Sequence, residues 1–138
     1  VYSAQQKTDE AIAAYRRAIA LNDLDAWSMN NLGLLFFEQG FVEDAVPYLA
    51  RAVEIKMNVP AFHNNLGMAL EHMGRFGGAA EAYKGALAAD PRYEKAKQNL
   101  ARVEAVKGGP EEPFDLAVLA RGRVEERKVA SDETREEQ

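Results

Sequence analysis

Apolar and small residues recur along the chain at helical spacing, in short segments that end at glycines. Residues 31–37 carry Leu32, Leu35 and Phe36 at helical spacing, and residues 65–73 repeat this arrangement. Spacings of three and four residues place such side chains on one face of a helix. Gly40 and Gly74 follow these segments, and glycine permits the positive φ of a tight turn. The pattern predicts short amphipathic helices and an all-α fold.

Each of these glycines is followed by a second predicted helix, over roughly 43–56 and 77–89. Their apolar stripes are Ala45, Leu49, Ala52 and Val53, then Ala79, Tyr83, Ala86 and Leu87. Pro47 stands near the start of one helix, where its missing N–H costs least. Asp90 and Pro91 end the other helix.

The segments repeat with a period of 34 residues. The tripeptide at 31–33, Asn-Leu-Gly, returns at 65–67, and Asn-Leu-Ala follows at 99–101. Further series in the same phase are Ala11, Ala45 and Ala79; Ala18, Ala52 and Ala86; Tyr15, Leu49 and Tyr83; and Ile19, Val53 and Leu87. Gln6 stands where Gly40 and Gly74 stand in the later units. A fixed period of this length indicates a solenoid of stacked helix pairs.

This pattern resembles the tetratricopeptide repeat family over residues 1–107. The repeat length, the Leu-Gly pair, the turn glycine, the two small alanines, the aromatic between them and the closing proline carry the resemblance. The sequence departs from the family at Met29 and His63, where a large aromatic is expected, and at Asp23 and Met57, where the proline is expected. The resemblance implies a right-handed α-solenoid of helix-turn-helix repeats.

The register divides the chain into a repeat domain over 1–107 and a tail over 108–138. A partial repeat covers 1–25 and lacks most of its first helix, and complete repeats cover 26–59 and 60–93. Residues 94–107 are predicted to form a capping helix. The chain opens with Val1, so we expect that the natural N-terminus lies upstream.

Composition and charge exclude several classes of protein. The 138 residues carry a net charge of -5, and nine acids against five bases fall in residues 108–138. This balance argues against a nucleic-acid partner, which requires a basic patch. The chain has no cysteine, which excludes disulfides, Cys-ligated zinc and a Cys nucleophile. Apolar runs are too short to insert into a membrane. The compartment stays open, with the cytoplasm favoured and the periplasm not excluded.

No motif in the sequence predicts catalysis, a metal or a cofactor. His63 and His72 lie nine residues apart and point to opposite sides of a helix, whereas a metal pair needs a spacing of three or four. Packing is therefore expected for His63 and exposure for His72. Gly77 and Gly78 lack the lysine that a phosphate-binding loop requires. We expect that the chain is not an enzyme.

The family resemblance implies that the first helix of each repeat lines a concave groove. The predicted groove residues are Trp27, Asn30, Asn31, Leu34, Phe37, Asn64, Asn65, Met68, Lys95, Gln98, Asn99 and Arg102. Asn31, Asn65 and Asn99 would form a ladder, similar to one in some peptide-binding members of the family. Because an amide both donates and accepts, such a ladder could hold the backbone of an extended peptide. An ordinary solvent-facing role for the ladder stays open.

Trp27, Leu34, Phe37 and Met68 are the predicted apolar anchors, unless neighbouring helices bury them. Lys95 and Arg102 would favour acidic residues at one end of the groove. Other members of the family clamp the carboxylate of chaperone tails with several basic residues. Here only Lys95 fits that pattern, so a chaperone-tail receptor is not expected.

The tail carries a second apolar pattern. Asp115 could cap a helix over about 115–128, and Phe114, Leu116 and Leu119 would dock on an apolar surface of this chain or of a neighbour. A free tail helix is the alternative.

The sequence thus predicts an interaction module that binds a protein or peptide segment in its groove. Two alternatives stay open: a self-associating scaffold that assembles through the N-terminal half-repeat and the tail, and a regulatory repeat domain of a larger enzyme.

Overall fold

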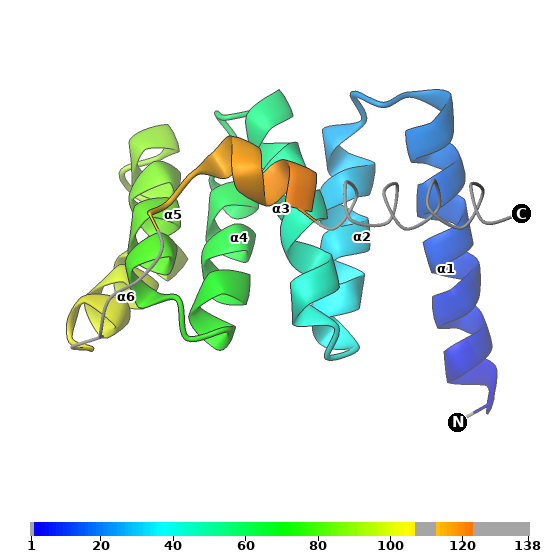
Figure 1. Cartoon of the computed structure of the whole chain (residues 1–138), viewed down its shortest axis with the longest axis horizontal. Helices are drawn as coiled ribbons and strands as arrows, with labels where there is room; N and C mark the ends of the chain where they lie inside the picture. Colours follow the sequence, from blue (N-terminus) through cyan, green and yellow to red (C-terminus); the bar gives the residue numbers. More distant parts are fainter. Residues whose placement is uncertain (1, 107–112, 123–138) are drawn as a thin grey trace, which may run out of the picture.

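The computed structural model describes residues 2–106 and 113–122 and is helical throughout its ordered elements (Figure 1). The helices are α1 (Tyr2–Leu21), α2 (Ala26–Glu38), α3 (Val42–Ile55), α4 (Pro60–His72), α5 (Phe76–Ala89) and α6 (Glu94–Glu104). Residues 116–122 are also helical, up to the end of the described part of the tail, and are here called the tail helix. The described residues contain no strand, so the predicted all-α class is confirmed.

Helices α1–α6 stand side by side in chain order and form a solenoid (Figure 1). Each first helix packs on the second helix that follows it, α2 on α3 and α4 on α5. Leu32, Leu49, Phe62, Leu66 and Tyr83 are fully buried between them. The periodic positions therefore form one continuous core, as expected for stacked repeats.

The two turn glycines give both complete repeats the same corner. Gly40 and Gly74 have φ values of 89° and 78°, and no other described residue has a positive φ. In each corner the N–H after the glycine donates to the carbonyl five residues earlier, Phe41 to Phe36 and Arg75 to Leu70, both at 2.9 Å. This bond closes the helix end and fixes the direction in which the chain leaves.

No corner forms at Gln6. The register places the end of a first helix and a turn at this position, but α1 runs through it as one helix of 20 residues. A side chain on Cβ makes the left-handed conformation costly, so glutamine favours continuation of the helix where glycine would end it.

Polar side chains cap two helix starts. Asp25 precedes α2, and its carboxylate accepts from the Ser28 N–H at 3.1 Å and from the Ser28 hydroxyl at 2.7 Å. These hydrogen bonds lower the pKa of Asp25 because they stabilise its charged form. Asp115 accepts from the Val118 N–H at 3.1 Å at the start of the tail helix.

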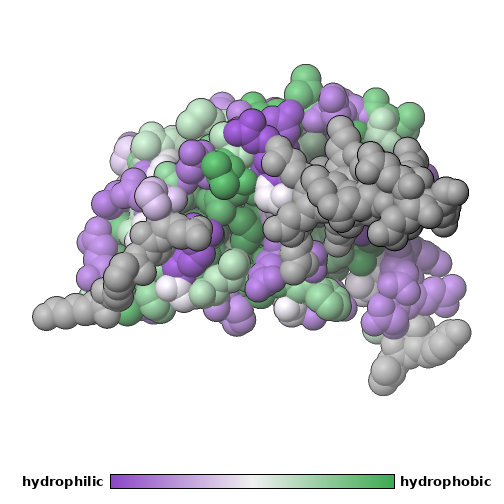
Figure 2. All heavy atoms as spheres, viewed as in Figure 1, coloured by the Kyte–Doolittle hydropathy of each residue, from purple (hydrophilic) through white to green (hydrophobic). Residues whose placement is uncertain are grey.

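The tail helix crosses the outside of α3 (Figure 1). Leu119 and Ala120 are 9% and 8% exposed and belong to the main core cluster. Phe114 and Leu116 are half-buried and pack against the same cluster. Figure 2 shows hydrophobic residues gathered at the middle of this face, among hydrophilic surroundings. Residues 123–128 of the predicted tail helix lie outside the described part of the chain.

Candidate peptide-binding surface

The first helices α2, α4 and α6 are joined by pairs of asparagine amides. Asn65 Nδ2 donates to Asn30 Oδ1 at 3.0 Å, and Asn99 Nδ2 donates to Asn64 Oδ1 at 2.9 Å. Each bond links the fifth place of one repeat to the sixth place of the next. Because both bonds span 35 residues, the pairing repeats with the solenoid. We call the face formed by α2, α4 and α6 the first-helix surface.

The two members of each amide pair differ in exposure. Asn30 and Asn64 are 5% and 3% exposed, so they lie beneath the surface and hold adjacent repeats together. Asn31, Asn65 and Asn99 are half-buried and retain contact with solvent. A buried amide needs a partner because an unpaired one is costly. Sequence reasoning placed all five amides in one groove and missed this division between structural and accessible positions.

A charged cluster lies where α4, α5 and α6 meet. Glu71 accepts from the Tyr83 hydroxyl at 2.7 Å, and Arg102 donates to both of its oxygens at 2.8 and 2.7 Å. Arg102 also donates to Asn99 Oδ1 at 2.9 Å. Both the Asn99 amide nitrogen and its oxygen are therefore engaged within the protein.

This cluster shifts three pKa values. Hydrogen bonds from Arg102 hold the pKa of Glu71 below its ordinary range, with a smaller contribution from Tyr83. Burial raises the pKa of Tyr83, and the adjacent Glu71 carboxylate raises it further. The same carboxylate raises the pKa of Arg102. Sequence reasoning treated Arg102 as a cation for an acidic ligand and did not pair it with Glu71, which lies on the preceding first helix. The sequence contained a signal for this ion pair, because Glu71 and Arg102 lie on consecutive first helices and on the same face of each.

The apolar side chains of the first-helix surface are unequally exposed. Trp27 is 52% exposed, and its ring packs edge-on against Phe62 with centroids 4.8 Å apart. Phe37 packs edge-on against His72 at 5.6 Å. Leu34 and Met68 are half-buried. Trp27 is thus a large aromatic that is half exposed and packs against the ring of Phe62.

A small pocket of about 240 Å³ lies between α1 and α2. Asn31, Leu34 and Glu38 line it, and so do Ala11, Tyr15 and Leu35, which sequence reasoning had not assigned to the site. At the other end of the surface, Lys95 and Gln98 are exposed on α6. Two acidic side chains thus adjoin the predicted residues: Glu38 lies beside Asn31 and Leu34, and Glu71 binds Arg102.

The two histidines of the chain have separate surroundings. His63 is 7% exposed, with Nε2 2.7 Å from the Met57 carbonyl oxygen, and His72 is exposed. Among residues 2–106 and 113–122, no group of three or more His, Cys, Asp or Glu could hold a metal ion. None of the helices described here is long and apolar enough to cross a membrane.

Comparison with protein families agrees with this architecture. One family model, described as TPR repeat, matches residues 1–40, and another, described as tetratricopeptide repeat, matches residues 32–94. The chain belongs to the tetratricopeptide repeat (TPR) family. No curated protein matches the sequence of this TPR chain.

Solved TPR structures share the fold. The TPR domain of Arabidopsis OM64 is 25% identical, with a TM-score of 0.67 over 76% of this chain and 87% of that domain. A Thermobaculum terrenum O-GlcNAc transferase is 27% identical, with a TM-score of 0.61 over 71% of this chain and 19% of the transferase. The second TPR domain of human RPAP3, in complex with an HSP70 peptide, is 19% identical over 76% of this chain and 88% of that domain, with a TM-score of 0.68. At that identity the last match shows the fold alone.

Proposed function

We propose that the first-helix surface of this TPR protein binds an extended polypeptide segment of a partner protein. The observation that carries the proposal is Trp27, an oriented aromatic that is half exposed on the same face as two accessible amides. Aromatic side chains of this kind are frequent energetic centres of protein interfaces. The coarser function, a protein–protein interaction module, follows from the TPR architecture.

The accessible amides suit a main-chain ligand. Asn65 uses Nδ2 to bind Asn30, and no described residue donates to its Oδ1, which can therefore accept from a peptide N–H. Asn31 lies one turn from Trp27 on α2, so the two side chains project from one face. Asn99 is engaged on both sides, so we assign the ladder role to Asn31 and Asn65 rather than to all three.

The charges of the surface favour a segment without a strongly acidic end. Arg102 is neutralised by the bidentate Glu71 contact, which leaves Lys95 as the exposed cation among the proposed contact residues. Glu38 is exposed at the opposite end, beside Asn31 and Leu34. A receptor for an acidic tail needs several convergent cations, and this surface does not provide them. Apolar and main-chain recognition therefore dominate the proposal.

The test is selection of binding peptides on the full chain, followed by affinity measurement with variants. Trp27→Ala and Asn65→Ala should each weaken the selected peptides about tenfold or more, because they remove the aromatic anchor and the amide. Lys84→Ala, on the outer side of α5, is the matched control and should leave affinity unchanged. If the first-helix variants bind as well as the unmodified chain, the proposal is wrong.

A further inference from the structure

The outer face of α3 carries apolar residues at two repeat positions where α5, the corresponding helix of the other complete repeat, carries charged ones. Pro47 and Ala50 are buried on α3, whereas Glu81 and Lys84 stand at the same repeat positions of α5 with 54% and 52% of their side chains exposed. Val46, beside them, is 5% exposed. An outward face of a terminal or middle repeat is ordinarily polar because it faces water. The exception on α3 therefore indicates a surface that is covered.

The tail helix is what covers this face. Leu119 and Ala120 are buried in the same cluster as Val46 and Ala50. A Cβ built on Gly122 would lie 3.3 Å from Pro47 Cγ, so the backbone of the tail helix comes close to the proline ring. Val118, on the opposite side of the tail helix, is 59% exposed. The apolar side of the tail helix thus faces the apolar exception on α3.

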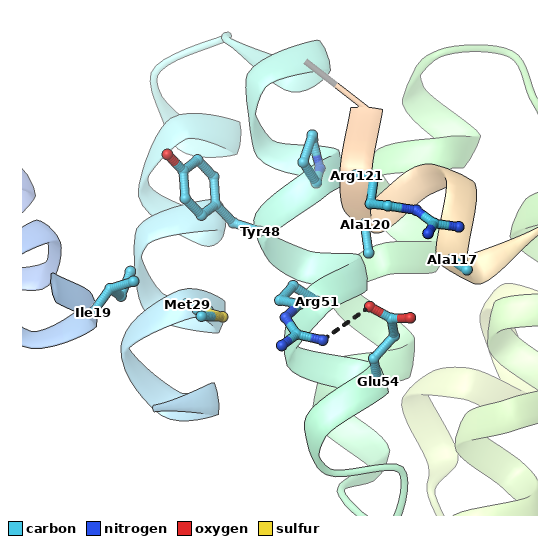
Figure 3. A pocket seen from close by; sticks show the side chains of 9 residues that line it. Ile19, Met29, Tyr48, Arg51, Glu54, Ala117, Ala120 and Arg121 are labelled. Atoms are coloured by element: carbon cyan, nitrogen blue, oxygen red, sulfur yellow. Dashed lines mark hydrogen bonds and ion pairs between the residues drawn. The ribbon is translucent and has the colours of Figure 1, made fainter. Parts of the chain in front are cut away.

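A pocket remains beside this contact. It has a volume of about 590 Å³ and lies between α1, α2, α3 and the tail helix. Figure 3 shows Ala117, Ala120 and Arg121 of the tail helix on one side of it, and Tyr48 with the Arg51–Glu54 ion pair on α3. The two alanines leave the pocket unfilled, so the tail helix makes less contact than a larger side chain would allow.

We propose that the outer face of α3 is a second docking surface and that residues 113–122 are its ligand, held in cis as a latch that opens while the repeats stay folded. Among residues 113–122 only Leu119 and Ala120 are buried, so the described contact with α3 is small. Segments with few buried contacts open locally, at lower cost than global unfolding. The latch is separate from the first-helix surface and does not rest on the peptide-binding proposal.

The decisive variant changes α3 and leaves the tail sequence untouched. Pro47→Glu with Ala50→Lys gives α3 the pair that α5 carries, in a repeat position where an exposed Glu–Lys pair is already accommodated. Trypsin cleavage after Arg121, followed by mass spectrometry on the full chain, reports how often the latch is open. We expect cleavage at this bond to become about tenfold faster or more, while circular dichroism shows the same helical unfolding transition. Unchanged cleavage would overturn the latch.

Two further measurements test which side of the tail helix docks and whether it docks on its own chain. Ala117→Leu should fill the pocket and slow cleavage after Arg121, whereas Leu119→Asp should accelerate it and Val118→Asp should have little effect. Equal effects of the last two variants would contradict docking through the buried side. Cleavage should also be independent of protein concentration. Protection that increases with concentration would mean that a second copy supplies the tail, and the cis assignment would be wrong.

Discussion

The two complete repeats have the same backbone arrangement and differ in the side chains at two contact surfaces. Residues 26–59 and 60–93 have the same glycine corner and the same amide place in their first helices. They diverge at the helix–helix contact, where Leu49 stands in one and Tyr83 in the other, and on the outer face, where α3 is apolar and α5 is charged. The positions that are the same in both repeats form the solenoid. The positions that differ give each repeat different packing contacts.

The helix–helix contact is the clearest difference. A Cβ on Gly33 would lie 2.8 Å from Leu49 Cδ2, and a Cβ on Gly67 would lie 2.5 Å from Tyr83 Cε1. Both glycines therefore allow close approach of two helices. The Cβ on Gly33 would also lie 2.8 Å from Leu49 Cγ and 3.1 Å from the Ala45 carbonyl oxygen, so the leucine would have to shift as a whole. Leu49 and Tyr83 are both fully buried, but the leucine side chain is flexible, whereas the Tyr83 ring is rigid and bound to Glu71. The second repeat is consequently the less tolerant of the two.

The largest expected effect is the substitution Gly67→Ala. Overpacking a rigid buried ring costs about 1–3 kcal/mol, and the gain in helix propensity offsets only about 0.5–1 kcal/mol of this. We expect Gly67→Ala to lower the free energy of unfolding by about 2 kcal/mol and Gly33→Ala by about 1 kcal/mol. Urea unfolding measures both.

A rescue tests the cause of that difference. Tyr83→Leu gives the second repeat the residue of the first, and in the Gly67→Ala background it should recover part of the lost stability. Equal losses for Gly33→Ala and Gly67→Ala, or no recovery, would show that the ring is not the reason.

The next effect concerns the hydroxyl that only the second repeat uses. Tyr83→Phe removes the 2.7 Å hydrogen bond to Glu71 and should lower the free energy of unfolding by about 1.5 kcal/mol, the lower end for bonds to charged groups. Tyr48→Phe is the matched control, on the half-buried outer side of α3, and should change stability by about 0.5 kcal/mol or less. Chemical unfolding of the two variants should separate them clearly.

The smallest expected effect is the pH dependence of the Glu71 cluster. The folded state lowers the pKa of Glu71, so its contribution to stability is complete above the ordinary carboxyl pKa and disappears as the pH falls through the lowered value. The difference in Tm between the unmodified chain and Glu71→Gln should therefore be present at neutral pH and vanish in acid. Glu38→Gln, an exposed carboxylate of the first repeat, is the control. A Tm difference for Glu71→Gln that persists in strong acid would contradict this assignment.

Much of the fold could be predicted because the repeated positions encode it locally. Glycine at 40 and 74 specifies a positive φ, and the alanine and leucine series specify which faces pack. The continuous α1 was not foreseen, although the sequence held the reason, since Gln6 replaces the turn glycine. A repeat register gives the expected place of a turn, and the residue at that place decides whether one forms.

The site was less predictable because it depends on contacts between repeats. Periodicity marks Asn30 and Asn65 as groove positions, but it does not reveal that one amide is buried beneath the other. The neutralisation of Arg102 requires the position of Glu71, 31 residues away. The surface on which the tail helix packs could have been predicted, because Pro47 and Ala50 occupy the repeat positions at which α5 carries a Glu–Lys pair.

The amide pairs between α2, α4 and α6 also have a consequence for how such an array grows. Each bond needs one asparagine from the earlier unit and one from the later unit, 35 residues on. A copied 34-residue unit that carries both would find a partner on each side wherever it is inserted within the stack. Duplication in frame preserves the bond at every new joint, and a shift by one residue breaks it. The amide bond is therefore retained only when the array is lengthened by whole repeat units.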